Sequence, residues 1–394
     1  MLRFLQYTAT GLLLALAITP RPAQAEAHRG AGHHAEPLPP QETGFLNRTV
    51  QLHGATYRFQ VYLPETYRKD DRKPWPVILA LHGRGERGSE GMWQTQIGVP
   101  EAVRDHPERW PFVIVMPQCP LPNYWTDPEM LLMAMAALDQ ETAEFHLDPE
   151  RTYLTGLSMG GYGAWELARL HPRRWAAVVI AASGIFWSYA PERWQEASTL
   201  PAEYSRALGS TPVWLFHGGD DNIITPRQSE LLFETLKAAG GHVRLWIYQG
   251  LKHDCWTRAY NEPELPRWML AHHLEAKPGA DLQASAERLL IPLHPPAIKL
   301  TPAMLDALVG EYRDANGGTV ETLFRQGEQL YEKNTHGEIA ELAAESPSVF
   351  FYPNGSSLSR LTFERDHEGR ATSAIFHDDR HEERWERHMA VSSR

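Results

Sequence analysis

The sequence predicts an α/β fold, with a mostly parallel sheet covered on both faces, followed by a small antiparallel β domain. Apolar strand-like segments alternate with helical segments from about Leu46 to Leu274, which is typical of parallel βαβ units. The segment Pro76–Leu81 is continuously apolar, as expected for a strand with helices on both sides. Later, the chain changes to short β-like segments separated by turns that contain glycine and asparagine.

The first 44 residues are expected to lie outside this fold. Arg3, the apolar segment Gly11–Ile18 and the small residues Ala23-Gln24-Ala25 follow the order of a cleaved signal peptide, and the apolar segment is too short to span a bilayer. Residues 1–25 therefore predict export to the periplasm or out of the cell, with a retained membrane anchor as the alternative. Residues 26–44 are rich in Pro, Gly and His and predict a flexible linker, whose histidines are expected to be solvated rather than bound to a metal.

The region 45–277 opens with a hairpin and a buried strand. Residues 49–63 alternate between polar and apolar side chains, which predicts a β-hairpin. The apolar strand at 76–81 leads into the glycine-rich loop His82-Gly83-Arg84-Gly85. Taken alone, this loop is most simply a flexible turn. Beside a nucleophile, it would offer backbone N–H groups to an oxyanion.

A strand-to-helix turn with the pattern G-x-S-x-G follows at Gly156–Gly160. The β-type segment Arg151–Leu154 precedes it, and the helical segment Tyr162–Leu170 follows. In such a turn the serine, here Ser158, lies at the apex with a strained backbone, and the helix N-terminus directs N–H groups toward an oxyanion. The pattern alone also fits a glycine-rich turn with an incidental serine, so a base and an acid are needed to support the first interpretation.

Candidates for the acid and the base follow the next two apolar strands. Residues 212–216 lead to two neighbouring acids, Asp220 and Asp221, and residues 243–248 lead to His253. The chain order serine, acid, histidine is that of a catalytic triad on a mostly parallel sheet. Loops at the carboxyl ends of parallel strands share one edge of the sheet, so the three side chains are expected to meet there. Both acids satisfy this order.

The stretch from about Leu46 to Leu274 resembles a family of α/β-hydrolases, the predicted peptidases and esterases related to feruloyl esterases and polyhydroxybutyrate depolymerases. The local similarities are Leu81–Gly88, Met116–Pro120 followed by Trp125, Gly156–Gly163, and His253–Trp256 followed by Tyr260. The family's H-G-x-x-D pattern begins at His217, which implies that Asp221 rather than Asp220 is the acid.

The same resemblance implies hydrolysis by a serine nucleophile without a metal or an organic cofactor. The implied catalytic residues are Ser158, Asp221 and His253, and the backbone N–H groups of Arg84 and Met159 are the implied oxyanion hole.

Aromatic and cysteine side chains are also expected near this site. The stretch Ile185–Leu208 interrupts the strand–helix alternation and is expected to form a small cap. The residues expected to line the substrate pocket are Trp125, Trp187 and Trp256, with ordinary packing as the alternative for each ring. In an exported protein, Cys119 and Cys255 can form a disulfide, and two free, partly buried thiols are the equal alternative.

A second domain is expected after a proline-rich linker at 278–299. Residues 300–394 begin with a short helix from Thr301 to about Gly310, and the β-like segments that follow are 319–324, 329–332, 349–352, 361–364 and 373–377. This region resembles the small β domain that follows some β-lactamase-like and hydrolase domains. Since it carries no catalytic motif, we interpret it as a stability or packing module, with carbohydrate or polymer binding as the alternative.

Composition narrows the function further. A chain of 394 residues can bury a sizeable core, and its net charge of −11 disfavours nucleic acid or an anionic membrane as a partner, because these need a basic face. The sequence thus predicts a secreted or periplasmic serine carboxylesterase for short-acyl or aryl (feruloyl-type) esters, either small or linked to a polymer. A serine peptidase with the same triad is the first alternative, and a non-catalytic binding protein is the second.

Overall fold

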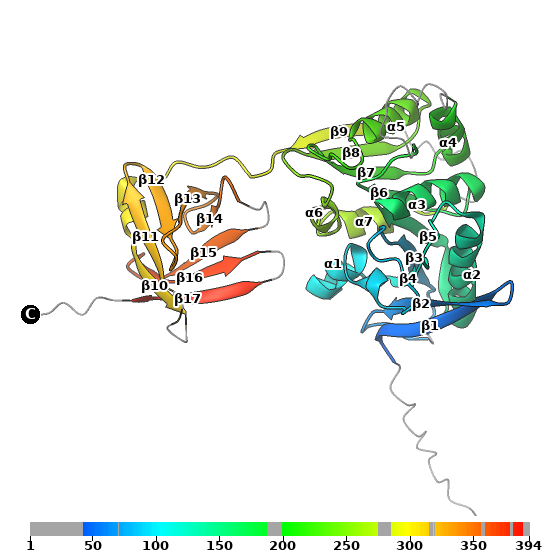
Figure 1. Cartoon of the computed structure of the whole chain (residues 1–394), viewed down its shortest axis with the longest axis horizontal. Coiled ribbons are helices and arrows are strands. Elements are labelled where there is room, and N and C mark those ends of the chain that lie inside the picture. Colours follow the sequence, from blue (N-terminus) through cyan, green and yellow to red (C-terminus); the bar gives the residue numbers. More distant parts are fainter. Residues whose placement is uncertain are drawn as a thin grey trace, which may run out of the picture. The chain divides into compact units, whose positions relative to one another are not determined.

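The computed structural model describes residues 42–69, 71–186, 199–274, 285–314, 318, 320–355, 359–378 and 381–388. The predicted signal peptide, most of the predicted N-terminal linker and Trp187 lie outside these residues. None of the helices in the described ranges has the length and apolar character needed to cross a bilayer. A mixed sheet with its helices and a β-barrel make up the described chain (Figure 1).

A sheet of nine strands, counted over the described residues, organises the first part. Its order is β1-β2-β4-β3-β5-β6-β7-β8-β9; β2 runs antiparallel to β1 and β4, and all other neighbours are parallel. The strands are β1 (Gly44–Leu52), β2 (Ala55–Leu63), β3 (Trp75–Leu81), β4 (Val113–Pro117), β5 (Leu147–Leu157), β6 (Ala177–Ala181), β7 (Val213–Gly218), β8 (Val243–Tyr248) and β9 (Ala286–Ile291). This topology is that of an α/β-hydrolase, so the predicted fold class is confirmed.

Helices cover both faces of this sheet (Figure 1). One face carries α2 (Pro128–Glu144), α3 (Met159–Leu170), α4 (Leu200–Leu208) and α5 (Arg227–Ala238). The other face carries α1 (Val99–Asp105), α6 (Trp256–Tyr260) and α7 (Leu265–Leu270). Two single-turn 3₁₀ helices, η1 (Trp93–Thr95) and η2 (Pro107–Arg109), flank α1.

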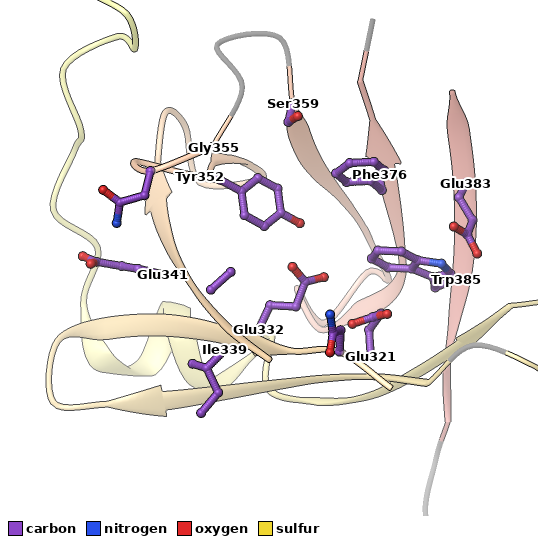
Figure 2. Close-up of a pocket in the computed structure, with 13 residues that line it drawn as sticks. Glu321, Glu332, Ile339, Glu341, Tyr352, Gly355, Ser359, Phe376, Glu383 and Trp385 are labelled. Atoms are coloured by element: carbon purple, nitrogen blue, oxygen red, sulfur yellow. The ribbon is translucent and has the colours of Figure 1, made fainter. Parts of the chain in front are cut away.

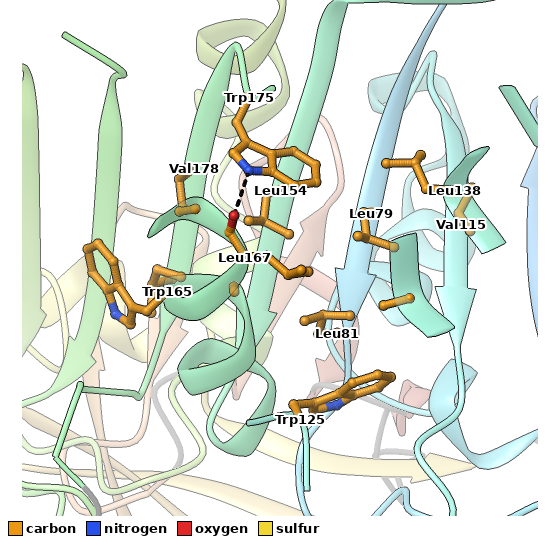
Figure 3. Close-up of a cluster of buried hydrophobic side chains, with 14 of the residues drawn as sticks. Leu79, Leu81, Val115, Trp125, Leu138, Leu154, Trp165, Leu167, Trp175 and Val178 are labelled. Atoms are coloured by element: carbon orange, nitrogen blue, oxygen red, sulfur yellow. Dashed lines mark hydrogen bonds between the residues drawn. The ribbon is translucent and has the colours of Figure 1, made fainter. Parts of the chain in front are cut away.

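Each face of the sheet has its own apolar core because side chains alternate along a strand. Leu79 of β3 belongs to the core beneath α2–α5, whereas its neighbour Ile78 belongs to the core beneath α1, α6 and α7. In the first core, Trp175 packs near Leu154, and its indole Nε1–H donates to the carbonyl of Leu167 at 3.3 Å (Figure 3). The continuously apolar β3 is thus explained by burial on both sides.

The edge strand β9 lies inside the stretch that the sequence predicts as a linker. Residues 286–291 pair in parallel with β8, and Val243 N–H donates to the carbonyl of Ser285 at 2.9 Å. Most side chains of β9 are exposed, as is usual for an edge strand, so the sequence offers little apolar alternation. The linker expectation for 278–299 is therefore wrong at β9, which extends the sheet domain to at least Ile291.

The second part is a closed antiparallel barrel preceded by the short helix α8 (Pro302–Asp306). The barrel strands are β10 (Gly310–Asp314), β11 (Val320–Gln326), β12 (Gln329–Lys333), β13 (Ile339–Ala344), β14 (Val349–Phe351), β15 (Arg360–Arg365), β16 (Ala371–His377) and β17 (Glu382–His388). Each pairs with the next, and β10 pairs with β17 to close the barrel. The predicted small antiparallel β domain is confirmed, and closure removes exposed strand edges.

The domain boundary can be tested with two truncated chains. A chain that ends after Lys299 retains β9, whereas a chain that ends after Pro278 leaves the edge of β8 unpaired. We expect the shorter chain to melt roughly 5 °C or more below the longer one and to aggregate more readily on gel filtration. Equal melting temperatures would show that β9 adds nothing to the sheet domain.

Candidate active site

Ser158 lies at a sharp turn between β5 and α3. Its backbone has φ 49° and ψ −118°, a conformation that side-chain-bearing residues rarely adopt, and its N–H donates to the carbonyl of Ala181 at 2.9 Å. A Cβ at Gly156 would lie 2.2 Å from the carbonyl oxygen of Gly160, and a Cβ at Gly160 would lie 2.0 Å from that of Leu81. Only glycine permits these two approaches, which hold the serine at the apex.

His253 joins Ser158 to Asp221 through its two ring nitrogens. Nε2 lies 2.8 Å from Ser158 Oγ, and Nδ1 lies 2.8 Å from Asp221 Oδ2. An ionised carboxylate can only accept, so Nδ1 carries the proton, and the neutral ring then accepts the serine hydroxyl proton at Nε2. This arrangement prepares His253 to act as a base toward Ser158.

Four N–H groups surround the buried carboxylate of Asp221. Oδ1 accepts from the backbone N–H groups of Ile223 and Ile224 at 2.8 and 2.9 Å. Oδ2 faces His253 and the fully buried His217, whose Nε2 is 3.2 Å away. Burial alone would raise the pKa of Asp221, but hydrogen bonds from the two histidines and Ile224 outweigh it and lower the pKa strongly. The carboxylate therefore stays ionised over the whole working pH range.

His217 is a buried part of the site to which the sequence analysis assigned no role. Its Nε2 lies 2.8 Å from the carbonyl of Ile224, so this nitrogen carries a proton that is shared with Asp221. Its Nδ1 lies 2.7 Å from Ser229 Oγ on α5. His217 thereby fixes the turn that presents Asp221. The only sequence signal was its place as the first residue of the H-G-x-x-D pattern.

The loop after β3 lies close to Ser158 and is ordered by His82. A Cβ at Gly83 would lie 3.7 Å from the Cβ of Ser158. His82 Nδ1–H donates to the Gly83 carbonyl at 2.6 Å, and Nε2 accepts the N–H of Cys119 at 2.9 Å. Burial lowers the pKa of His82 to about 4, so the ring is neutral at physiological pH. It orders the loop that carries Arg84.

Trp125 supports this loop rather than lining a pocket. Its side chain is 0% exposed, its Nε1–H donates to the carbonyl of His82 at 3.0 Å, and its ring meets the edge of the His82 ring with centroids 5.1 Å apart. A fully buried ring has no surface to offer a substrate. The pocket expectation for Trp125 is thus corrected: the residue packs in the core beneath α2–α5.

Of the two expected oxyanion donors, Met159 directly follows Ser158, and Arg84 follows Gly83, which lies close to Ser158. Met159 is the first residue of α3, so its N–H has no acceptor one turn earlier in the helix. Arg84 lies on the His82 loop, and its side chain is exposed. The N-terminal end of α3 carries a partial positive charge, which suits an oxyanion beside Ser158.

Of the other two expected pocket residues, Trp256 lies beside the base. It is half-buried at the start of α6, and its ring stands edge-on to His253, with centroids 5.3 Å apart. Trp187 lies outside the described residues. In the described part of the expected cap, Phe186 and Tyr204 are buried, and Tyr204 packs against Trp165 of α3. These two rings belong to the core.

Cys119 and Cys255 are free, buried thiols, so of the two alternatives the structure favours the unpaired one. Cys119 lies in the core beneath α2–α5, and Cys255 lies in the core on the opposite face of the sheet. The sheet separates the two sulfur atoms. Burial raises the pKa of both thiols, which keeps them protonated. Among the described residues, no group of three or more His, Cys, Asp or Glu side chains is placed to hold a metal.

Residues 134–274 match the sequence model of the prolyl oligopeptidase family. This match spans Ser158, Asp221 and His253, and with the geometry above it identifies a serine hydrolase domain. A comparison with curated protein sequences finds no match.

Solved structures that resemble the chain include a thermostable esterase, with a TM-score of 0.49 and 26% identity over 58% of this chain and 63% of that one. Acylaminoacyl peptidase from Pyrococcus horikoshii aligns with a TM-score of 0.47 and 16% identity over 61% of this chain and 43% of that one. A ferulic acid esterase aligns with a TM-score of 0.46 and 17% identity over 58% of this chain and 100% of that one. The chain thus spans less than two thirds of the first two proteins.

The two neighbouring acids allow a matched test of the site. Asp221→Asn is expected to lower kcat for p-nitrophenyl acetate by roughly 10⁴-fold, because an amide that donates to Nδ1 would hold the proton of His253 on Nε2. Asp220 is exposed, and His253 Nδ1 is bonded to Asp221 instead, so Asp220→Asn should leave kcat within about threefold of the parent. Comparable losses in both variants would contradict the assignment of Asp221.

Proposed function

We propose that the chain is an exported serine carboxylesterase that uses Ser158, His253 and Asp221 as its catalytic triad. The observation that carries this proposal is the continuous hydrogen-bonded line from Ser158 Oγ through His253 to Asp221, with 2.8 Å at each step. The line begins at a strained turn next to a helix N-terminus, where a nucleophile meets backbone N–H donors. Export is proposed from the N-terminal sequence pattern.

The proposed reaction proceeds in two halves. Ser158 Oγ attacks the ester carbonyl while His253 Nε2 takes the hydroxyl proton, and the N–H groups of Met159 and Arg84 stabilise the oxyanion. The tetrahedral intermediate expels the alcohol, which receives the proton from His253, and an acyl-serine remains. Water then gives a proton to His253 and attacks the acyl carbonyl. The second tetrahedral intermediate collapses, His253 returns that proton to Ser158 Oγ, and the acyl group leaves as the carboxylic acid.

Asp221 serves both halves of this reaction without changing its own charge. Its lowered pKa keeps it ionised, and the negative charge stabilises His253 each time the ring becomes an imidazolium. The Nε2 proton of His217 is directed at Oδ2, the same carboxylate oxygen that accepts from His253, and restricts rotation of the carboxylate. The hydrogen bond to Nδ1 therefore persists when Nε2 changes from acceptor to donor.

A serine peptidase is the second candidate, and the match with the prolyl oligopeptidase family favours it. The same triad can cleave an amide, but the amine is a poorer leaving group that must be protonated as it departs. We prefer ester substrates with short acyl or aryl groups, such as feruloyl esters, because the motifs after β3 and β8 are similar to those of esterases. The half-buried Trp256 ring beside His253 would contact an acyl or aryl group there.

A substrate panel separates the two candidates. We expect p-nitrophenyl acetate, p-nitrophenyl butyrate and methyl ferulate to be hydrolysed with kcat/KM values roughly 100-fold or more above those of aminoacyl p-nitroanilides. A preference for the anilides would replace the esterase proposal with a peptidase.

Removing the nucleophile tests the triad itself. Ser158→Ala is expected to lower ester turnover by roughly 10⁵-fold or more, because serine and histidine act as one unit. Circular dichroism and the melting temperature serve as checks of folding. Ser210→Ala, at an exposed serine after α4, is the matched control and should retain full turnover. Substantial activity in folded Ser158→Ala would mean that another group is the nucleophile.

A further inference from the structure

The C-terminal barrel contains a cavity of about 510 Å³, and all of the residues that line it belong to the barrel domain. Six of the side chains that line it determine its chemistry, and they come from several strands and one loop. These are Glu321, Glu332, Tyr352, Phe376, Glu383 and Trp385 (Figure 2). None of the described lining residues is Lys, Arg or His. The cavity is therefore acidic and aromatic, and it lies within the size range of small-molecule sites.

Two carboxylates in this cavity are buried without a compensating charge. Glu321 on β11 is 6% exposed and Glu332 on β12 is 7% exposed. Within the part of the chain that the structure describes, Glu321 Oε2 and Glu332 Oε1 have no hydrogen-bond partner. Among the described residues, the Tyr352 hydroxyl donates a side-chain hydrogen bond to the Glu332 carboxyl group. Unpaired acceptors of this kind cost stability while the carboxyl groups are ionised, and either protonation or a ligand with positive charge relieves that cost.

These two carboxylates occupy inward-facing strand positions, where a barrel normally places apolar side chains. Side chains on β11 and β12 alternate, so Glu321 faces inward like Leu323, and Glu332 faces inward like Leu330. Leucines at the same faces belong to the apolar core of the barrel. A barrel needs no carboxylate at an inward position for folding, because an apolar side chain there would be more stable. The two acids therefore point to binding rather than to packing.

An aromatic wall stands next to the carboxylates. The rings of Phe376 and Trp385 are stacked, with centroids 6.0 Å apart and an interplanar angle of 15°. Tyr352 meets Phe376 edge-on, with centroids also 6.0 Å apart. Figure 2 shows the Tyr352 and Trp385 side chains directed toward the same space as the Glu332 carboxylate. Ring faces beside acidic oxygens attract organic cations by both charge and the ring quadrupole.

We propose that this cavity binds an organic ammonium ion, with the nitrogen between Glu321 and Glu332 and the alkyl or aryl body against Tyr352, Phe376 and Trp385. The described residues include no group of three His, Cys, Asp or Glu side chains placed for a metal, and three aromatic rings would offer a hydrated metal ion few ligands. A neutral sugar would stack on the rings but leave the buried charges uncompensated. The site is separate from the ester chemistry, so the proposal does not rest on the esterase assignment.

The binding experiment uses the full chain. Isothermal titration calorimetry compares benzyltrimethylammonium with benzyl alcohol, which has a ring but no charge. Mg²⁺ and cellobiose test the metal and sugar alternatives. We expect saturable binding of the ammonium compound with one site per chain, and roughly tenfold or more weaker binding of benzyl alcohol. Equal affinity for benzyl alcohol, preference for Mg²⁺ or cellobiose, or no binding of the ammonium compound would each overturn the proposal.

Charge-removing variants locate the site. Glu321→Gln and Glu332→Gln should each weaken benzyltrimethylammonium binding by roughly tenfold or more, because each keeps the shape of the side chain and loses its charge. Glu328→Gln is the matched control: Glu328 is exposed at the turn between β11 and β12, and its loss should leave affinity unchanged. The melting temperature of both cavity variants should be no lower than that of the parent at about pH 8.5, since an unpaired buried charge is removed. Unchanged binding in folded cavity variants would place the site elsewhere and refute the proposal.

The pH dependence gives an independent readout. Burial, with the nearby charges of Glu332 and Glu383, raises the pKa of Glu321 to about 7. The titratable groups facing Glu321 are Glu332, Glu383 and Tyr352, and Glu383 also pairs with His381 at 3.6 Å. Because the cation needs an ionised carboxylate, affinity should fall by roughly tenfold or more between about pH 8.5 and about pH 5.5. Equal affinity at both pH values would contradict the proposed role of Glu321.

Discussion

The candidate site depends on the register of the parallel strands β5 to β8. Leu157, Ala181 and Phe216 are successive partners across β5, β6 and β7, and Gly218 pairs with Tyr248 across β7 and β8. The loops that carry the serine, the acid and the histidine therefore leave one edge of the sheet at closely similar levels. A slip of one residue in any pair would turn each side chain to the opposite face and dismantle both cores. The two hydrogen bonds of the triad thus follow from the packing of the whole sheet.

The meeting of Ser158, His253 and Asp221 could be predicted from the sequence because each residue comes soon after an apolar strand. The pattern around Ser158 requires glycines for a steric reason, and the structure shows the close approaches that the pattern implies. The supporting residues were harder to identify. Trp125 follows a recognisable motif, but a sequence cannot show whether an aromatic ring near a site faces the substrate or the core. His217 was visible in its motif, and its role emerges only from the distance to Asp221.

Three of the strands that the sequence analysis did not name, β9, β10 and β17, share a lack of apolar alternation. β9 lies at an exposed edge, and its apolar residues Leu289, Leu290 and Ile291 are consecutive rather than alternating. In β17, which contains five charged residues and one histidine, Trp385 is the single buried side chain. β10 likewise buries only Tyr312 among polar and charged neighbours. In this barrel, β10 and β17 are hydrogen-bonded to a strand on each side, and this pairing stabilises their β conformation. The conformation of such strands therefore depends on their partners more than on their own sequences.

Buried carboxyl groups in the two domains have pKa values that are shifted in opposite directions. Asp221 is surrounded by donors, and the pKa of its carboxyl group falls despite burial. Glu321 has no such donors, and burial with its acidic neighbours raises its pKa to about 7. The difference lies in the partners, since both side chains are largely removed from water. A buried carboxylate with a full set of donors, such as Asp221, has its charge stabilised by the protein itself. This suits a residue that must stay ionised through a reaction. A buried acid without donors must either take up a proton, as its raised pKa allows, or remain ionised beside a positive ligand, and the second state is the physical reason to expect a ligand in the barrel.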